Sequence, residues 1–347
     1  MNVIVGVDIG GTKISVILGT VTGKIIEKCV IKTQRKGGAA ACIAEIIAII
    51  KALLLKRSVK KSDLLGIGVN IPGPFGEEEG VILNAPNLKG WQGINIKKIL
   101  TRHFRCRVIC NNDANTAALA EKMFGCGKKV RSLVYVTIST GIGSGIIIDN
   151  KLLMGANNNA GELGHTVVDL NGPRCNCGKK GCLEAIASGT AIETIARNVM
   201  NRSKRIDEYK NEFAYKKYCT THTHFILSPK GSILQNIQGK ITAFAIEKAA
   251  KKGDSLAKYI YWRAGYYFGV GLANVIQLIN PEMIAFGGGV VNAGSLYFNA
   301  MNSALKDHAW PQPLKCCKIV KASLGSRVAD VGAISLVIED LRYKHKR

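Results

Sequence analysis

The chain has 347 residues, of which 47% are hydrophobic, so it can form one large or two ordinary domains with a substantial apolar core. The most apolar stretch, residues 39–55, is interrupted by Glu45 and Lys51 and predicts a buried helix. The first residues enter a strand-like run directly, without the features of a signal peptide, so we expect a cytoplasmic protein with no membrane partner.

The composition is strongly basic, with 48 Lys and Arg against 24 Asp and Glu and a formal net charge of +24. A nucleic-acid-binding protein would concentrate such residues on one element beside base-reading side chains. Here they are spread along the chain, which favours a solvated surface that steers anionic substrates. The cysteines number eleven, an odd count without a framework spacing, and this indicates reduced thiols and not disulfides.

An apolar strand at residues 3–9 is followed at once by a second strand at 14–19, and the pair predicts a hairpin. Backbone N–H groups of a glycine pair at such a turn can face a phosphate. Taken alone, an aspartate and two glycines at a hairpin more often form a plain turn. The residues of interest in and beside this turn are Asp8, Gly10, Gly11, Thr12 and Lys13.

A third strand at 25–31, a long helix at 38–55 and a strand at 65–71 follow. That last strand stops at a rigid break, Pro72-Gly73-Pro74. The loop at 84–91 contains Asn87, a proline and an aromatic residue. It suits the wall of a carbohydrate site, and it also suits an ordinary surface loop.

A short strand at 108–110 delivers Asn111, Asn112 and Asp113 to the start of a helix at 114–124. The helix dipole favours a carboxylate at this place as the anion. Asp113 is therefore a candidate catalytic carboxylate, and it is also a candidate N-cap residue, since Asp performs that role routinely.

A second glycine-rich turn lies between apolar strands at 133–139 and 146–148, and we expect it to form a loop over residues 140–145. Its candidate phosphate-binding residues are Thr140, Gly141 and Gly143. Two hairpins of similar construction imply two similar half-domains, each offering backbone donors to one polyphosphate.

The stretch GELGHTVVDLNGPRCNCGKKGCLE, residues 161–184, carries the most specific signal in the chain. Three thiolates and one imidazole are the ligands of a closed tetrahedral zinc site, and glycines let the backbone turn between them. The alternative is a solvated histidine among ordinary buried thiols. Two carboxylates, Glu162 and Glu184, flank the four candidate ligands, which are His165, Cys175, Cys177 and Cys182.

The remaining third of the chain begins with a helix at 191–200. We expect residues 201–240, which are polar and basic, to form a surface excursion. Helices resume at 241–279, and a strand at 283–286 ends in Gly287, Gly288 and Gly289, which permit close approach of the adenosine end of a nucleotide. A strand at 317–322 and a helix at 331–341 complete an α/β pattern of two lobes with a cleft between them.

Taken together, these motifs resemble those of the ROK family, which groups bacterial sugar kinases and related repressors within the actin-like ATPase superfamily. The resemblance extends from residue 3 to about residue 341. It implies an α/β, two-lobed actin-like ATPase (ribonuclease H-like) fold. We expect the smaller lobe at 1–112 with 327–347 and the larger lobe at 113–326. The resemblance further implies a homodimer.

The resemblance also implies roles for individual residues. The two hairpins would hold the phosphates of Mg²⁺-bound ATP, and Asp113 would be the general base. Zinc would be structural and would orient His165 and Glu184. The sugar would contact Gly73, Asn87, Asn112, Asp113, Glu162, His165 and Glu184. ATP would contact Asp8, Gly10, Gly11, Thr12, Lys13, Thr140, Gly141, Gly143, Gly287, Gly288 and Gly289.

Within the family, the expected activity is phosphorylation of a hexose, with glucose as the first choice and N-acetylmannosamine or N-acetylglucosamine as alternatives. A sugar-sensing repressor is the rival from another functional class. The chain begins seven residues before Asp8, which argues for the kinase because a repressor carries an amino-terminal helix-turn-helix. Ser139 departs from the family pattern, since many members have glycine there.

Overall fold

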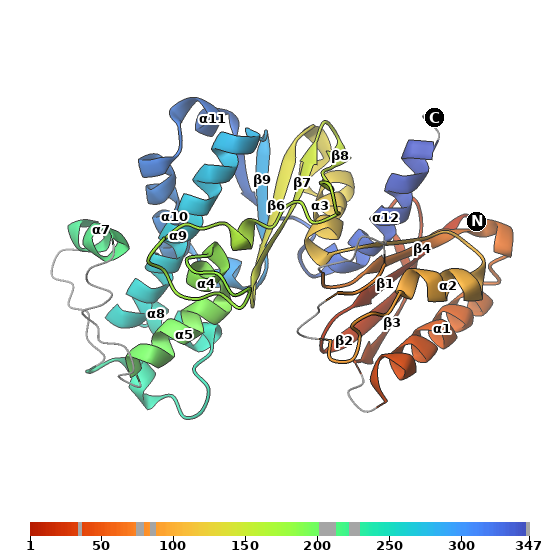
Figure 1. Cartoon of the computed structure of the whole chain (residues 1–347), viewed down its shortest axis with the longest axis horizontal. Helices are drawn as coiled ribbons and strands as arrows, with labels where there is room; N and C mark the ends of the chain where they lie inside the picture. Colours follow the sequence, from red (N-terminus) through yellow and green to blue (C-terminus); the bar gives the residue numbers. More distant parts are fainter. Residues whose placement is uncertain (34–36, 74–79, 84–87, 201–212, 222–229, 345–347) are drawn as a thin grey trace. The chain divides into compact units, whose positions relative to one another are not determined.

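The computed structural model describes residues 1–33, 37–73, 80–83, 88–200, 213–221 and 230–344 (Figure 1). Contacts along the chain divide it into two compact units, and each is described by itself. Unit 1 comprises Met1–Tyr135, Ser144–Gly161 and Ala322–Arg347, and unit 2 comprises Val136–Gly143 and Glu162–Lys321. The two lobes expected from the sequence, with boundaries at residues 112 and 327, stay a prediction.

Unit 1 contains a mixed five-stranded sheet in the order β3-β2-β1-β4-β5. β1 pairs antiparallel with β2 and parallel with β4, and β4 pairs parallel with β5. The parallel strands therefore present their carboxyl ends at one edge, where Asp8 lies opposite Asn70 and Asn70 lies opposite Asn111. The strands are β1 (Val3–Ile9), β2 (Lys13–Gly19), β3 (Ile25–Lys32), β4 (Leu64–Asn70) and β5 (Val108–Asn111).

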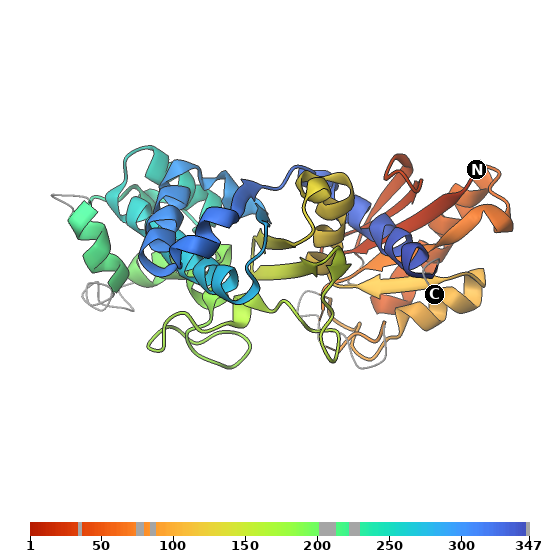
Figure 2. The same cartoon turned by 90° about the horizontal axis from the view of Figure 1, so that it is seen from above.

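Helices cover both faces of this sheet because its strands are apolar on both sides. α1 (Gly38–Lys56) and α2 (Ile96–Phe104) bury isoleucine and leucine against one face. α1 is long and apolar enough to cross a membrane, but its buried side belongs to this core, so it is a core helix as the sequence predicted. α12 (Val328–Lys344) and α3 (Asp113–Phe124) pack on the opposite face (Figure 2).

α12 lies close to the sheet because glycine replaces a side chain beneath it. A Cβ atom added to Gly68 in β4 would stand 1.8 Å from the carbonyl oxygen of Ala333. No larger residue fits without moving the helix.

The second five-stranded sheet has the order β10-β9-β6-β7-β8. Its strands are β6 (Leu133–Ile138), β7 (Ile142–Ile148), β8 (Lys151–Leu152), β9 (Met283–Gly287) and β10 (Lys318–Lys321). In unit 2, α9 (Ser255–Ile279) is buried along most of its length, so it shows little amphipathic period. The helices that contact it are α4 (Leu183–Ala187), α5 (Gly189–Met200), α7 (Phe213–Thr221), α8 (Ala243–Lys251), α10 (Ser295–His308) and α11 (Pro311–Cys316).

The second glycine-rich turn is shorter than the sequence predicted. β7 already begins at Ile142, so Gly143 and Gly145 lie inside a strand and the predicted loop at 140–145 was wrong in its extent. Gly145 serves helix packing, because its Cβ would stand 2.6 Å from the carbonyl oxygen of Ala114 in α3. A glycine required by close packing is indistinguishable in sequence from one required by a phosphate.

The polar excursion at 201–240 is partly packed. Residues 201–212 and 222–229 lie outside the described residues, but α7 buries Tyr218, whose ring meets Trp262 of α9 edge to face at 5.1 Å. The surface excursion therefore includes a helix, α7, that packs one side against α9 and exposes Lys216 and Thr220. Helices α2, α4, α7, α10 and α11 were not predicted from the sequence.

Candidate functional site

A series of polar contacts on the α3 side of the sheet in unit 1 leads from the carboxylate of Asp8 to the backbone carbonyl of Asp113. The Nδ2 atom of Asn70 donates to Oδ1 of Asp8 at 2.7 Å. The Oγ1 atom of Thr116 lies 3.0 Å from Oδ1 of Asn70 and 2.9 Å from the carbonyl oxygen of Asp113. Asn70 and Thr116 are both buried, so solvent does not compete for these bonds.

The pKa of Asp8 is raised to about 6, first because burial disfavours the charged carboxylate and second because Asp330 of α12 lies nearby. Asp113 adds to the rise, whereas the hydrogen bond from Asn70 and the charge of Lys13 oppose it. Asp330 itself accepts a hydrogen bond from Oγ of Ser15 at 2.8 Å and forms an ion pair with Lys28.

Asp113 is the first residue of α3, and Asn112 is its N-cap. Oδ1 of Asn112 accepts from the N–H of Asn115 at 2.8 Å, whereas Oδ1 of Asp113 accepts from the N–H of Ala114 at 2.9 Å. The capping role therefore falls to Asn112, which leaves Asp113 available for chemistry. Although part of the Asp113 side chain is exposed, the protein around its carboxylate raises the pKa by desolvation, and the bond from Ala114 partly offsets the rise.

The first hairpin is a tight turn between β1 and β2. The N–H of Gly10 donates to the carbonyl oxygen of Lys13 at 3.0 Å, and Oγ1 of Thr33 donates to the carbonyl oxygen of Gly10 at 2.6 Å. The side chains of Thr12 and Lys13 are exposed beside it. Gly73 follows β4 by three residues, and Asn87 lies outside the described residues.

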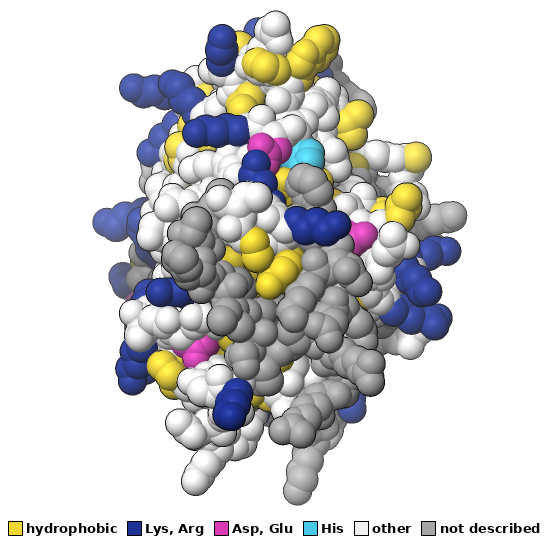
Figure 3. All heavy atoms as spheres, turned by 90° about the vertical axis from the view of Figure 1, so that its left-hand side faces the viewer, with side chains coloured by type: hydrophobic (Ala, Val, Ile, Leu, Met, Phe, Trp, Pro, Cys, Tyr) yellow, Lys and Arg dark blue, Asp and Glu magenta, His cyan; other side chains and the backbone are white. Residues whose placement is uncertain are grey.

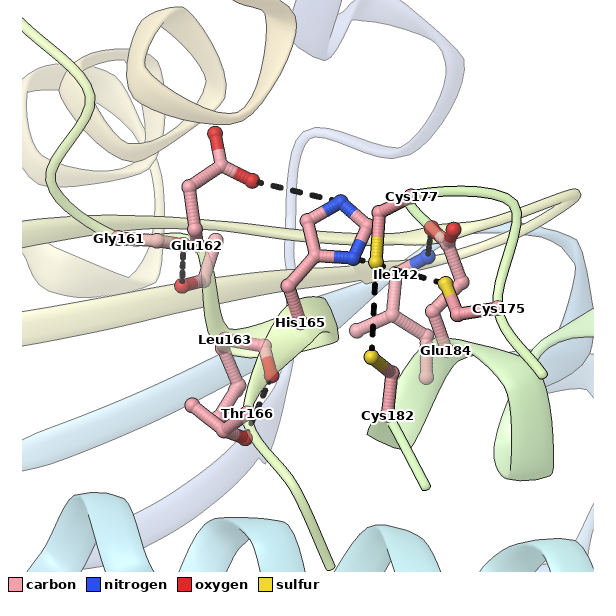
Figure 4. A network of polar contacts seen from close by, with 11 residues as sticks. Ile142, Gly161, Glu162, Leu163, His165, Thr166, Cys175, Cys177, Cys182 and Glu184 are labelled. Atoms are coloured by element: carbon pink, nitrogen blue, oxygen red, sulfur yellow. Dashed lines mark hydrogen bonds and ion pairs between the residues drawn. The ribbon is translucent and has the colours of Figure 1, made fainter. Parts of the chain in front are cut away.

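The four predicted metal ligands of unit 2 come together (Figure 4). One donor atom from each of His165, Cys175, Cys177 and Cys182 lies within 4.8 Å of the others. The sulfur atoms of Cys177 and Cys182 are 3.7 Å apart, as are the sulfur of Cys175 and Nδ1 of His165. A zinc ion with bonds of about 2.3 Å to sulfur needs tetrahedral edges of about 3.8 Å, so the cluster fits zinc.

The backbone of the cluster folds back on itself. The N–H of Cys175 donates to the carbonyl oxygen of Lys179 at 2.7 Å, and the N–H of Val168 donates to that of Gly181 at 2.9 Å. Gly178 and Gly181 have φ of +91° and +75°, which only glycine adopts readily. These two glycines therefore allow the tight turn that brings the cysteine sulfurs together.

The thiols of the cluster differ in acidity when no metal is bound. Burial raises the pKa of Cys182 to about 12 and also raises that of Cys175, whereas the backbone N–H of Lys179 lowers that of Cys177. Metal binding at neutral pH therefore displaces protons from buried thiols.

Two carboxylates flank the metal cluster. Nε2 of His165, the ring nitrogen that faces away from the sulfurs, lies 3.9 Å from Oε2 of Glu162 (Figure 4). Oε2 of Glu184 accepts from the N–H of Ile142 at 2.9 Å, at the start of β7. Glu184 therefore connects α4, which begins directly after Cys182, to the second hairpin.

The second hairpin and the glycine run after β9 open into one cavity of unit 2. Its volume is about 430 Å³, and it is lined by Thr140, predicted to contact phosphate, and by Gly289, predicted to lie near adenosine, but not by Gly287 or Gly288. Gly288 has φ of +98° and lies against Ile138, so it brings the run close to β6. No sequence motif marks the other lining residues, among them Glu193 of α5, Phe244 and Glu247 of α8 and Tyr261 of α9.

The predicted site residues thus form two sets. Unit 1 holds the first hairpin, Asn112 and Asp113, and unit 2 holds the second hairpin, the metal cluster, the two carboxylates beside it and the glycine run. Basic side chains are dispersed over the α7 side of the molecule (Figure 3).

Comparison with known proteins identifies the class. The ROK family model matches residues 4–340, so the chain belongs to the ROK family. The fold agrees with this assignment: the ROK hexokinase of Thermus thermophilus superposes with a TM-score of 0.78 over 99% of both chains, at 29% identity. The actin-like fold inferred from the sequence is therefore confirmed.

Relatives of two functional kinds match this chain. The glucokinase of Halalkalibacterium halodurans is 34% identical over 96% of this chain and 94% of its own length. The xylose repressor of Caldicellulosiruptor bescii is 30% identical over 97% of this chain and 78% of its own length. A ROK glucokinase from Streptomyces griseus, solved with glucose and AMPPNP, has a TM-score of 0.69 at 28% identity, covering 96% of this chain and 99% of that one.

Asp8→Asn should stabilise the ligand-free protein at neutral pH. Because its pKa in the folded state is raised, the stability that Asp8 contributes is full below about pH 4 and is lost as the pH rises through 6. Urea unfolding without Mg²⁺ or nucleotide should show a gain of about 1–3 kcal/mol at pH 7.5 and little gain at pH 4. The control is Asp149→Asn, at an exposed carboxylate. Equal gains at both pH values would contradict the assignment.

Cys177→Ser should abolish stoichiometric zinc binding and destabilise the segment around it, since a structural metal contributes folding energy directly. Elemental analysis after gel filtration should find about one zinc ion per chain in the wild type. Cys316→Ser, at an exposed cysteine of α11, is the control and should keep its zinc. A Cys177→Ser protein that retains full zinc occupancy would show that the ligand assignment is wrong.

Proposed function

We propose that the chain is an ATP-dependent hexose kinase that converts glucose to glucose 6-phosphate, with Asp113 as the general base. The observation that carries this proposal is the placement of Asp113 at the start of α3, relieved of capping by Asn112 and with a raised pKa. A carboxylate of raised basicity suits removal of a hydroxyl proton. The glucokinase relatives, which match over nearly their whole length, support the same activity.

In the proposed reaction, Asp113 takes the proton from a sugar hydroxyl as the hydroxyl oxygen attacks the γ-phosphorus of ATP. The bond from this phosphorus to the β,γ-bridging oxygen breaks, and ADP leaves. Such transfer depends on positioning and charge neutralisation more than on covalent catalysis. Mg²⁺ carried with ATP supplies charge neutralisation, and the exposed side chains of Thr12 and Lys13 add donors beside the first hairpin.

We assign the adenosine of ATP to the cavity of unit 2, with its phosphates toward the second hairpin. The cavity is lined by the side chains of Phe244 and Tyr261, by those of Glu193 and Glu247, and by Thr140 of the second hairpin. Aromatic rings offer stacking surfaces to a base, and carboxylates accept hydrogen bonds from ribose hydroxyls.

We assign sugar recognition to the surroundings of the metal cluster. With Nδ1 of His165 directed at the thiol sulfurs, Nε2 is left to donate beside the Glu162 carboxylate. Zinc, when bound, fixes this imidazole and the start of α4, and so it orients both His165 and Glu184. Hydroxyl groups donate and accept, so carboxylates and an imidazole N–H are suitable partners.

We also propose that the protein is a homodimer.

The direct test is ADP release from purified protein with Mg-ATP and a panel of glucose, mannose, fructose, N-acetylglucosamine and N-acetylmannosamine. Turnover highest on glucose supports the proposal. Preferential turnover on an N-acetylated hexosamine would keep the kinase and change its substrate. Sugar binding without turnover on any member of the panel would overturn the kinase assignment.

A sugar-sensing regulator is the second candidate. It is favoured by the xylose repressors among the relatives and by the net charge of +24. Both phosphate hairpins, Asp8 and Asp113 are nevertheless present, and a protein that only senses sugar has no use for a general base. Salt-dependent binding to duplex DNA that sugar releases, together with absent turnover, would favour the regulator.

Asp113→Asn should remove most turnover while leaving the fold and sugar binding nearly intact. An amide cannot take the proton, and a placed base contributes roughly 10²- to 10⁴-fold. The measurements are kcat from ADP release and the glucose Kd from calorimetry, with Asp149→Asn as the control. A variant that keeps more than about a tenth of the wild-type kcat would contradict the role of Asp113 as base.

A further inference from the structure

We propose that Asn70 and Thr116 are positioning residues, which form a polar chain from the Asp8 carboxylate to the backbone carbonyl of Asp113 and fix the place of that carboxylate relative to the first turn of α3. The inference rests on the proposed kinase activity for its role in turnover. Neither residue is expected to touch sugar or nucleotide, because both side chains are buried, with exposed fractions of 1% and 0%.

Few arrangements of donors and acceptors satisfy the polar contacts of Asn70 and Thr116. Asn70 presents its Nδ2 to Asp8 at 2.7 Å and its Oδ1 to Thr116 at 3.0 Å. An amide has donors only on nitrogen and acceptors only on oxygen, so an ionised Asp8 requires this orientation. The single proton of the Thr116 hydroxyl is then donated to Asn70, which fixes the amide, and the carbonyl oxygen of Asp113 receives no hydrogen bond from Thr116 in this state.

Protonation of Asp8 reverses the chain. A neutral Asp8 can donate to the Oδ1 of a flipped Asn70, whose Nδ2 then donates to the hydroxyl oxygen of Thr116. The hydroxyl proton is thereby directed to the carbonyl oxygen of Asp113, 2.9 Å away. One proton at the end of β1 is thus communicated to the first turn of α3 without movement of either element.

Charged groups on neighbouring elements also shift the pKa of Asp8. Asp330 of α12 and Asp113 of α3 disfavour its ionisation, and Lys13 of β2 favours it. Lys28 of β3 pairs with Asp330. The hydrogen bond from Asn70 is the contribution that a single neutral substitution can remove.

Thr116→Val tests the chain because it keeps the side-chain shape and removes the hydroxyl. We expect kcat to fall about 5- to 30-fold with both KM values within about threefold, since orientation is lost but binding groups are kept. Thr116→Ser retains the hydroxyl and should restore kcat to within about twofold. The matched control is Ser335→Ala, which removes a buried hydroxyl of α12 that bonds the carbonyl oxygen of Val331.

A second readout needs no turnover. Carbon-13 NMR titration of aspartate-labelled, ligand-free protein should place the Asp8 midpoint higher by roughly half a pH unit or more in Asn70→Ala and Thr116→Val. Thr116→Ser and Ser335→Ala should leave it in place. An unchanged midpoint in Thr116→Val, or a lower kcat that Thr116→Ser does not restore, would overturn the proposal. A wild-type protein without turnover would instead overturn the kinase assignment. The titration would still test whether Asn70 and Thr116 act on Asp8.

Discussion

The parallel pairing of β1 with β4 and of β4 with β5 is the constraint on which the candidate site of unit 1 depends. It sets Asp8, Asn70 and Asn111 side by side at one edge of the sheet, although more than a hundred residues separate the first from the last. The chain then enters α3 directly from β5, which places Asp113 beside that edge. Ligands of open α/β sheets bind at such carboxyl ends.

The candidate metal cluster of unit 2 is connected to the second hairpin through α4. Cys182 is the last residue of the cluster and occupies the N-cap position of α4, and two residues later Glu184 accepts a hydrogen bond from the N–H of Ile142. A cross-link of three sulfurs and an imidazole therefore supports both the groups assigned to sugar and the turn assigned to phosphate. Supporting contacts of this kind fix the orientation of groups that would otherwise sample several rotamers.

The buried carboxylate of Asp8 destabilises the folded protein at neutral pH. The carboxylate is ionised at neutral pH although burial and Asp330 both oppose it, and the Asn70 amide only partly compensates. A fold selected for stability alone would not keep that charge there. The arrangement is of the kind found where proteins retain a perturbed carboxylate for function, and it lies beside the proposed base.

The sequence by itself determined the features that depend on local spacing: both glycine hairpins, the four metal ligands and the ROK family. The zinc ligands are close in sequence and their turns need glycine, so few alternatives existed. Tertiary structure alone decided that Gly145 serves packing and that Asn70 and Thr116 lie between the Asp8 carboxylate and the backbone carbonyl of Asp113. The physical reason is that these roles arise between elements distant in sequence, where strand register and helix approach, and not local pattern, choose the neighbours.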